Sequence, residues 1–250
     1  MPFRLLLFVL LLHIMNDNNA AAQSPKRSLD ELINTKDPAW PLVQEWIKKA
    51  TNTVEVLDAD PLQAKETLLE IQVTTRSPMG AIILNSGGIL ADHGWIRILG
   101  SGHTKMKRTL YTWNQGKTID KDGQNSGYIL VADDAIGGYY AINGGGLGSD
   151  LGKAYFFDPT TLSWEALDIT YSQLIEFFFN GDLQSFYKDL RWHDWKKDVA
   201  GLDGNLVFNC YPMLWTKEGK DINKVSRKEI LAEEQYQSSI TAMHQLNGGK

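Results

Sequence analysis

Apolar residues of this chain follow two periodicities, one in the middle and another at the two ends. In the middle, short apolar runs alternate with polar or glycine-bearing stretches, which is typical of β-strands joined by turns. At both ends, apolar residues recur at helical spacing, as on one face of a helix. The strands that the pattern predicts are residues 54–57, 81–84, 89–91, 95–99, 128–131, 139–142, 154–157, 164–167 and 206–208, with a long ordered loop over 100–127.

Capping chemistry predicts where the first helices begin. Ser28–Glu31 has the order of a capping box, in which a hydroxyl and a carboxylate satisfy free backbone amides. Asp37-Pro38 and Asp60-Pro61 each place a capping carboxylate before a proline that suits the first helical position. We therefore expect helices at these three places, mostly ahead of the strands.

Helices return after the last strand of the middle region. The apolar stripe over residues 171–178 predicts a helix that Asn180-Gly181 ends, and Asp182 can cap the next helix. Ser226–Glu229 has the order of a second capping box and predicts the start of a C-terminal helix. Strands in the middle and helices at both ends favour one α+β domain over residues 23–250, with a mostly antiparallel or mixed sheet flanked by the terminal helices.

Glycines punctuate the most informative stretch, residues 127–146, which reads GYILVADDAIGGYYAINGGG. An apolar run meets the acidic pair Asp133-Asp134, and a second apolar run follows Gly137-Gly138. Glycine adopts the positive φ and the close approach that tight turns need. The stretch therefore predicts two strands joined by a tight connection.

The N-terminus has the three-part order of a secretory signal peptide. Arg4 precedes an apolar run over residues 5–12, and small residues follow at 20–22. This order predicts cleavage after Ala22 and export to the periplasm or the medium. The run is too short to cross a bilayer, which takes about 20 apolar residues. The alternative, a buried N-terminal helix, leaves the small-residue site unexplained.

Composition narrows the classes of partner. The net charge of −5 provides no basic footprint for nucleic acid. The single cysteine, Cys210, excludes an intramolecular disulfide. It lies in an apolar segment, where a buried and inert thiol is expected rather than a nucleophile.

Three phrases of the sequence carry a family resemblance. They are GWIRILGSGH at residues 94–103, VADDAIGG at 131–138 and LWTKEGKDI at 214–222. They resemble a bacterial family known as domain of unknown function 2625, and the resemblance extends over residues 28–244.

The order of strand, acidic turn, Gly-Gly, strand and Tyr171-Ser172 helix is also similar to the SUKH superfamily. SUKH domains are α+β modules, many of them immunity proteins that bind toxins and others scaffolds. The resemblance therefore implies a protein partner, such as a toxin, and it supplies no catalytic residues. The predicted export departs from the mostly cytoplasmic pattern of both groups.

Candidate catalytic and metal-ligating groups are few. Asp92, His93 and His103, with Arg97 between them, form the nearest polar cluster, but its histidines lack metal-ligand spacing. His193-Asp194 has the order of an ordinary helix start. The sequence contains no phosphate loop, dinucleotide-binding turn or nucleophile elbow. We therefore expect no metal and no cofactor.

Asp133 and Asp134 allow two interpretations. A pair of acid/base carboxylates would have to face one gap, whereas adjacent residues of a strand point to opposite faces. In the other interpretation, which we favour, both carboxylates bond turn amides.

Aromatic residues are the remaining signal, because they anchor cores and protein interfaces alike. Tyr139 and Tyr140 are consecutive in a predicted strand, so one of them is expected to face outward. The candidate binding residues are Trp95, Arg97, Asp133, Asp134, Gly137, Gly138, Tyr139 and Tyr140.

The sequence leads to a hypothesis of an exported, non-enzymatic domain that binds a protein partner in an immunity-type or scaffold role. The alternative is an enzyme for a small or cell-wall substrate, with a pocket around Asp133, Asp134, His93 and Arg97. A third hypothesis is a structural envelope protein with no concave site. The arrangement of those four side chains around a concave site, or their separation, discriminates between the first two.

Overall fold

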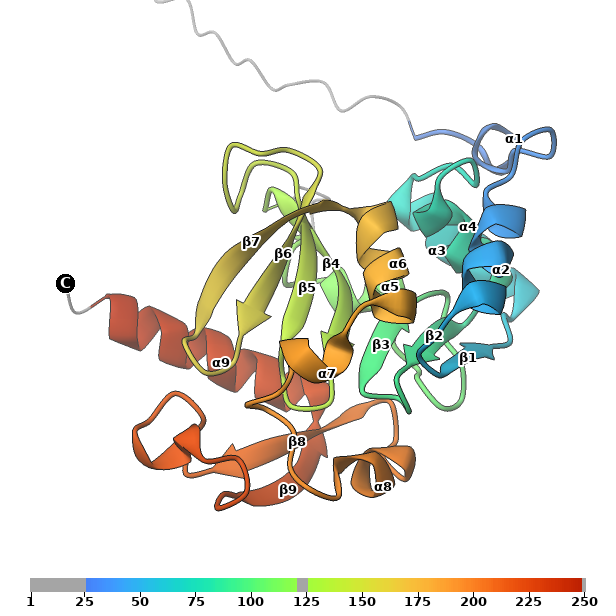
Figure 1. Ribbon diagram of the computed structural model, residues 1–250. Coiled ribbons are helices and arrows are strands. Elements are labelled where there is room, and N and C mark those ends of the chain that lie inside the picture. Colours follow the sequence, from blue (N-terminus) through green and yellow to red (C-terminus); the bar gives the residue numbers. More distant parts are fainter. Residues whose placement is uncertain (1–25, 121–125, 249–250) are drawn as a thin grey trace, which may run out of the picture.

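Seven antiparallel strands form one sheet in which neighbours in sequence are also neighbours in space (Figure 1). The computed structural model describes residues 26–120 and 126–248, so the predicted signal peptide at 1–22 lies outside the described residues. The strands are β1 (Val54–Leu57), β2 (Gly88–Ala91), β3 (Ile96–Leu99), β4 (Tyr128–Asp134), β5 (Tyr139–Asn143), β6 (Lys153–Asp158) and β7 (Ser163–Thr170). A two-stranded antiparallel sheet consists of β8 (Leu206–Tyr211) and β9 (Ser226–Leu231).

Helices cover both faces of the large sheet (Figure 1). Phe178 of α6 (Tyr171–Asn180) packs on Tyr140, and Tyr236 of α9 (Ala232–Asn247) packs on Tyr139. Because consecutive residues of a strand point to opposite faces, α6 and α9 lie on opposite sides of β5. The other helices are α1 (Leu29–Leu32), α2 (Trp40–Lys49), α3 (Pro61–Ile71), α4 (Pro78–Asn85), α5 (Leu110–Asn114), α7 (Leu183–Phe186) and α8 (Trp195–Ala200), with a 3-10 turn at Glu218–Lys220.

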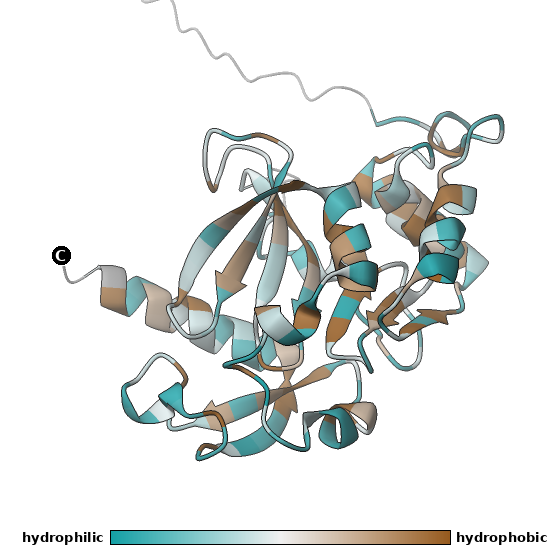
Figure 2. Cartoon of the chain, in the orientation of Figure 1, coloured by the Kyte–Doolittle hydropathy of each residue, from teal (hydrophilic) through white to brown (hydrophobic). Residues whose placement is uncertain are grey.

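The hydrophobic core therefore lies on both faces of the sheet. Hydrophobic residues concentrate along the strands, and hydrophilic residues occupy much of the loops and outer helix surfaces (Figure 2). Tyr139 and Tyr140 are both completely buried. The expectation that one of them faces outward is wrong, because the central strands have helices on both faces.

The α+β class expected from the sequence is confirmed, as are several of the caps. Ser28 and Glu31 form the predicted capping box of α1. Oδ1 of Asp60 accepts from the amides of Leu62 and Gln63, both at 2.9 Å, at the start of α3. These caps are local signals, which is why the sequence could predict the two helix starts.

Residues 81–84, expected to be a strand, belong to helix α4. Ser77 caps this helix by accepting from the amide of Gly80, and Pro78 occupies its first position. Ala81, Ile82 and Ile83 are all completely buried. A helix buried on every side has a continuous apolar run in place of a helical stripe, so periodicity could not separate it from a strand.

Two other expectations are corrected at helix starts. Residues 226–229 are in strand β9, paired with β8, and the C-terminal helix begins only at Ala232. The α2 helix begins at Trp40 with Ala39 as its cap, so Asp37 does not cap it. Within the loop expected over 100–127, Thr109 and Thr112 form a capping box that starts the short helix α5.

Candidate functional site

One row of paired residues crosses all seven strands of the large sheet. Each member lies opposite the next on the neighbouring strand, so all of them face the α9 side of the sheet. The row holds three of the predicted site residues. Its members, from β1 to β7, are Glu55, Leu90, Arg97, Asp133, Tyr139, Phe157 and Trp164.

A buried ion cluster occupies the middle of this row. Nε of Arg97 donates to Oδ1 of Asp133 at 2.8 Å, and Nη1 of Arg108 donates to Oδ2 at 2.5 Å. The side chains of Arg97 and Asp133 are 1% and 0% exposed, and that of Arg108 is 12% exposed. Burial lowers the pKa of Arg97, and the Asp133 carboxylate opposes this effect. Both oxygens of Asp133 are therefore engaged by arginines, not by turn amides as expected.

The same two arginines hold the segment that leads into β8. Nη1 of Arg97 donates to the carbonyl of Leu206 at 2.6 Å, and Nη2 of Arg108 donates to the carbonyl of Gly204 at 2.7 Å. Nη2 of Arg97 also donates to the carbonyl of Asp134. The Arg97–Asp133–Arg108 cluster thus joins the large sheet to the small one.

Asp134 shapes the turn between β4 and β5, as expected. Its Oδ1 accepts from the amides of Ile136 at 3.0 Å and Gly138 at 2.7 Å. Burial raises its pKa to about 6, against the opposing effect of these bonds. Gly137 has a φ of 87°, and a Cβ on Gly138 would overlap the Asp134 carboxylate, so both glycines are needed by the turn.

Trp95 is enclosed by aromatic rings and a second ion pair. Its ring meets those of Tyr187 and Trp195 with centroids 5.3 and 5.2 Å apart. The guanidinium of Arg191 lies over the Trp195 ring at 3.9 Å and donates to Asp92 at 2.5 Å. Trp95 is completely buried, so it packs in the core and offers no exposed binding surface.

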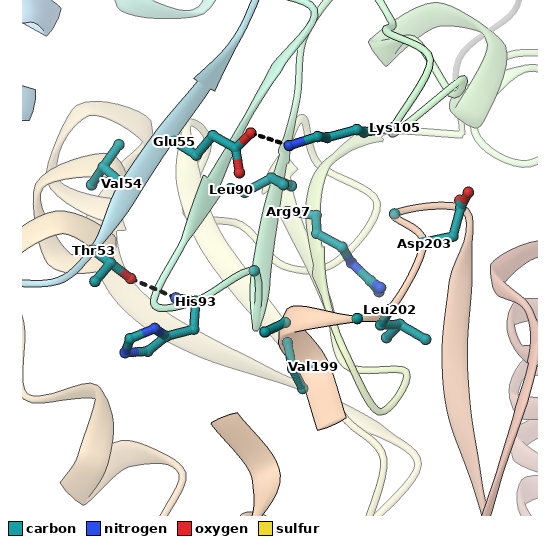
Figure 3. A pocket seen from close by; sticks show the side chains of 14 residues that line it. Thr53, Val54, Glu55, Leu90, His93, Arg97, Lys105, Val199, Leu202 and Asp203 are labelled. Atoms are coloured by element: carbon teal, nitrogen blue, oxygen red, sulfur yellow. Dashed lines mark hydrogen bonds and ion pairs between the residues drawn. The ribbon is translucent and has the colours of Figure 1, made fainter. Parts of the chain in front are cut away.

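A pocket of about 520 Å³ lies beside the β1 end of the row (Figure 3). His93 and Arg97 both line it, together with Glu55 and Lys105, which form an ion pair. Figure 3 shows the Arg97 side chain directed toward the segment of Leu202 and Asp203, with the His93 ring on the far side of the pocket. We call this cavity the Arg97 pocket.

The predicted enzymatic site is only partly assembled around this pocket. Arg97 and His93 share its lining, whereas Asp133 and Asp134 do not belong to it. The backbone amide of His93 donates to Oγ1 of Thr53 at 2.6 Å, and its ring lies 6.0 Å from that of Trp195. His103 lies elsewhere, in a turn closed by paired backbone bonds with Met106. The polar cluster proposed from the sequence is therefore divided.

A second pocket, of about 460 Å³, lies at the junction of α5 with the small sheet. We call it the Leu231 pocket, after a side chain whose residue is 56% exposed. Asp203 lines both pockets. The residues of the Leu231 pocket include Lys107, Arg108, Trp113, Asn205, Leu206 and Glu233.

Sequence reasoning missed this second site because its parts come from distant segments. Arg108 lies 25 residues from Asp133, and no local pattern connects them. Leu231 was assigned to a helix, where an exposed leucine has no special meaning. The one available signal was the apolar run at residues 206–208, which predicted a strand but not its partner; in the structure β8 pairs with β9.

Cys210 is buried, as expected from its apolar segment. Burial raises the pKa of its thiol to about 11. Within residues 26–120 and 126–248, no three His, Cys, Asp or Glu side chains gather in a way that could hold a metal ion. In the same two stretches, no helix combines the length and apolar character needed to cross a membrane.

Comparison with known proteins assigns the chain to a family. The family described as "Protein of unknown function DUF2625" matches residues 29–235. An uncharacterized protein of Haemophilus influenzae is 41% identical over 214 residues, which cover 86% of this chain and 94% of the relative. The putative uncharacterized protein YbfG of Escherichia coli K12 is 42% identical over 216 residues, covering 86% and 98%. No solved structure matches the chain. The chain therefore belongs to the DUF2625 family, as the three phrases of its sequence indicated.

Proposed function

We propose that this protein is a non-enzymatic domain that binds a protein partner. The observation that carries the proposal is the Leu231 pocket, where an exposed leucine lies beside Arg108. Arginine is enriched where protein interfaces gain most of their binding energy, and an exposed leucine offers apolar surface to a partner. The pocket is also next to a frame that the Arg97–Asp133–Arg108 cluster holds in place. A rigid frame favours tight binding because little conformational entropy is lost on association.

Asp133 and Arg97, the charged side chains of the buried cluster, already form hydrogen bonds with other groups of the protein. Both oxygens of Asp133 bind arginines, and all three nitrogens of the Arg97 guanidinium group have acceptors. A general base needs a lone pair within reach of the substrate. This pairing favours an architectural role for the cluster over an acid/base role.

An enzyme acting on a small or cell-wall substrate is the second candidate. One observation favours it, namely that His93 and Arg97 line the same pocket. The Arg97 side chain, however, has a carboxylate and two carbonyls as its partners. A substrate anion would have to compete with these buried bonds, so we rank this candidate second.

The proposal includes export and an immunity-type or scaffold role. The N-terminal order of Arg4, the apolar run and the small residues at 20–22 supports secretion. The similarity of the element order to SUKH modules supports a protein as the partner. Mass spectrometry of protein recovered from the periplasm or medium tests export, since cleavage after Ala22 predicts Gln23 as the first residue. An intact Met1 in that material would contradict the proposed cleavage.

Light scattering after size-exclusion chromatography tests the binding function. The purified protein is mixed in turn with the products of the adjacent genes, because partners of immunity-type proteins are encoded nearby. We expect one of these products to form a complex of fixed stoichiometry. Absence of any complex, or substrate turnover that disappears in an Asp133→Asn or His93→Gln variant, would contradict the proposal.

A further inference from the structure

Three residues that line the Leu231 pocket have a hydrogen-bond donor that no group among the described residues uses. Nε of Arg108 and Nε1 of Trp113 are buried and have no partner among the described residues. The Arg108 guanidinium lies 4.4 Å from the centre of the Trp113 ring, so the two groups are adjacent. Lys107, an exposed lysine of this pocket, forms no ion pair within the described part of the chain, so its Nζ is a third available donor. All three residues line the same cavity.

Three of the four carboxylate oxygens that line the pocket, those of Glu233 and one of Asp203, are already held. Oε2 of Glu233 binds Nζ of Lys117 at 2.6 Å. Oδ1 of Asp203 accepts from both the amide and the side chain of Asn205. The unused capacity is therefore mainly for donation, and two of the three donors carry positive charge. A carboxylate complements such a set in both hydrogen bonding and charge.

The other wall of the pocket is apolar. Leu206 and Leu231 are directly opposite each other on β8 and β9, and both line the cavity. Leu231 is more than half exposed, so an aliphatic side chain placed on it would remove apolar surface from water. Polar donors and an aliphatic pair thus lie within one cavity of about 460 Å³.

We propose that the Leu231 pocket binds an acidic segment of the partner protein, in which a carboxylate accompanies an aliphatic side chain. The inference rests on the proposed protein-binding function and specifies the chemistry that this function recognises. The carboxylate pairs with Lys107 and with the donors of Arg108 and Trp113. The aliphatic side chain packs on Leu206 and Leu231.

A methyl NMR titration with N-acetyl-leucine tests this recognition without any partner protein. This probe has one carboxylate and one isobutyl group, and N-acetyl-leucinamide is the matched probe without the charge. Leu151, 69% exposed in another region, is the internal control for Leu231. The two methyl signals are assigned from Leu231→Ser and Leu151→Ser variants, both of which change exposed side chains.

We expect N-acetyl-leucine to shift the Leu231 methyl signals saturably while those of Leu151 stay in place. The amide should bind about tenfold more weakly, since it loses the charge-assisted bonds. Lys107→Gln should weaken binding of N-acetyl-leucine and leave that of the amide unchanged. No saturable shift at Leu231, or equal responses to the two probes, would overturn the inference. Neither result bears on complex formation with an adjacent gene product, so failure of the inference and failure of the proposed function are distinguishable.

Discussion

Arg97 and Asp133 lie directly opposite each other on β3 and β4, and Nε of the arginine donates to Oδ1 of the aspartate at 2.8 Å. Neither side chain is more than 1% exposed. An ion pair removed from water in this way is stable only when its remaining polar atoms are also bonded. Arg108 and the backbone carbonyls of Leu206 and Asp134 provide those bonds. Leu206 is the first residue of β8, and Arg108 also donates to the carbonyl of Gly204 just before it.

The neighbouring tyrosines of β5 should respond in opposite ways to loss of their hydroxyl groups. The hydroxyl groups of Tyr140 and Tyr187 are 2.5 Å apart, so Tyr140→Phe leaves the hydroxyl of Tyr187 buried and unpaired. We expect it to lower the free energy of unfolding by about 1–3 kcal/mol. The hydroxyl of Tyr139 is buried without a partner among the described residues, so Tyr139→Phe should be neutral or stabilising.

Urea denaturation of the two variants checks this contrast, and each serves as the control for the other. Both substitutions remove one oxygen from a completely buried tyrosine of the same strand. Equal losses of stability would show that the pairing of the hydroxyl groups does not decide the effect.

Asp134 should make stability depend on pH in a defined direction. Burial raises its pKa from 3.8 to about 6 in the folded protein, so folding favours the protonated carboxyl. Its contribution to stability is therefore complete below pH 3.8 and is lost as the pH rises through 6. The gap between the two pKa values corresponds to about 3 kcal/mol.

An Asp134→Asn variant isolates this contribution, because asparagine keeps the oxygen that accepts from Ile136 and Gly138. We expect the variant to gain stability relative to the native protein, by up to about 3 kcal/mol, between pH 4 and pH 7. Unfolding free energies of the two proteins at matched pH give this difference. A difference that is constant over this range would mean that Asp134 titrates normally.

Cys210 should react slowly with thiol reagents in the native protein. Its pKa of about 11 leaves very little thiolate at pH 8, and the side chain is buried. Since the thiolate is the nucleophile, we expect modification by a disulfide reagent to be more than about 100-fold slower than for a free cysteine. In urea the single thiol of each chain should react fully. Rapid reaction without denaturant would contradict the buried position.

Most of the sheet could be predicted from the sequence because its signals are local. The turn between β4 and β5 needs Gly137 at positive φ, and its strands are continuous apolar runs. Helix α4 could not be distinguished from a strand in the same way, since burial on all sides removes the helical stripe. The capping order of residues 226–229 predicted a helix where the structure has strand β9, for a different reason. Pairing with β8 outweighed it, as tertiary contacts commonly outweigh local preference.

The candidate site was less predictable because it depends on contacts between distant residues. The sequence identified Arg97 and Asp133 as notable, but it could not supply Arg108, whose pairing with Asp133 depends on the path of the loop after β3. It also took Tyr139 and Tyr140 as a half-exposed pair. Their burial follows from α6 and α9 packing on opposite faces, which no pattern within β5 indicates.

Asp133 joins the large sheet to the small one through Arg97 and Arg108. The free energy of unfolding of an Asp133→Asn variant tests this connection most directly, with Glu55→Gln as the control at an exposed ion pair of the same row. We predict a loss of about 3–5 kcal/mol for Asp133→Asn, because two arginines would remain buried without their counter-charge. The control should lose no more than about 1 kcal/mol. An Asp133→Asn protein as stable as the control would contradict the account.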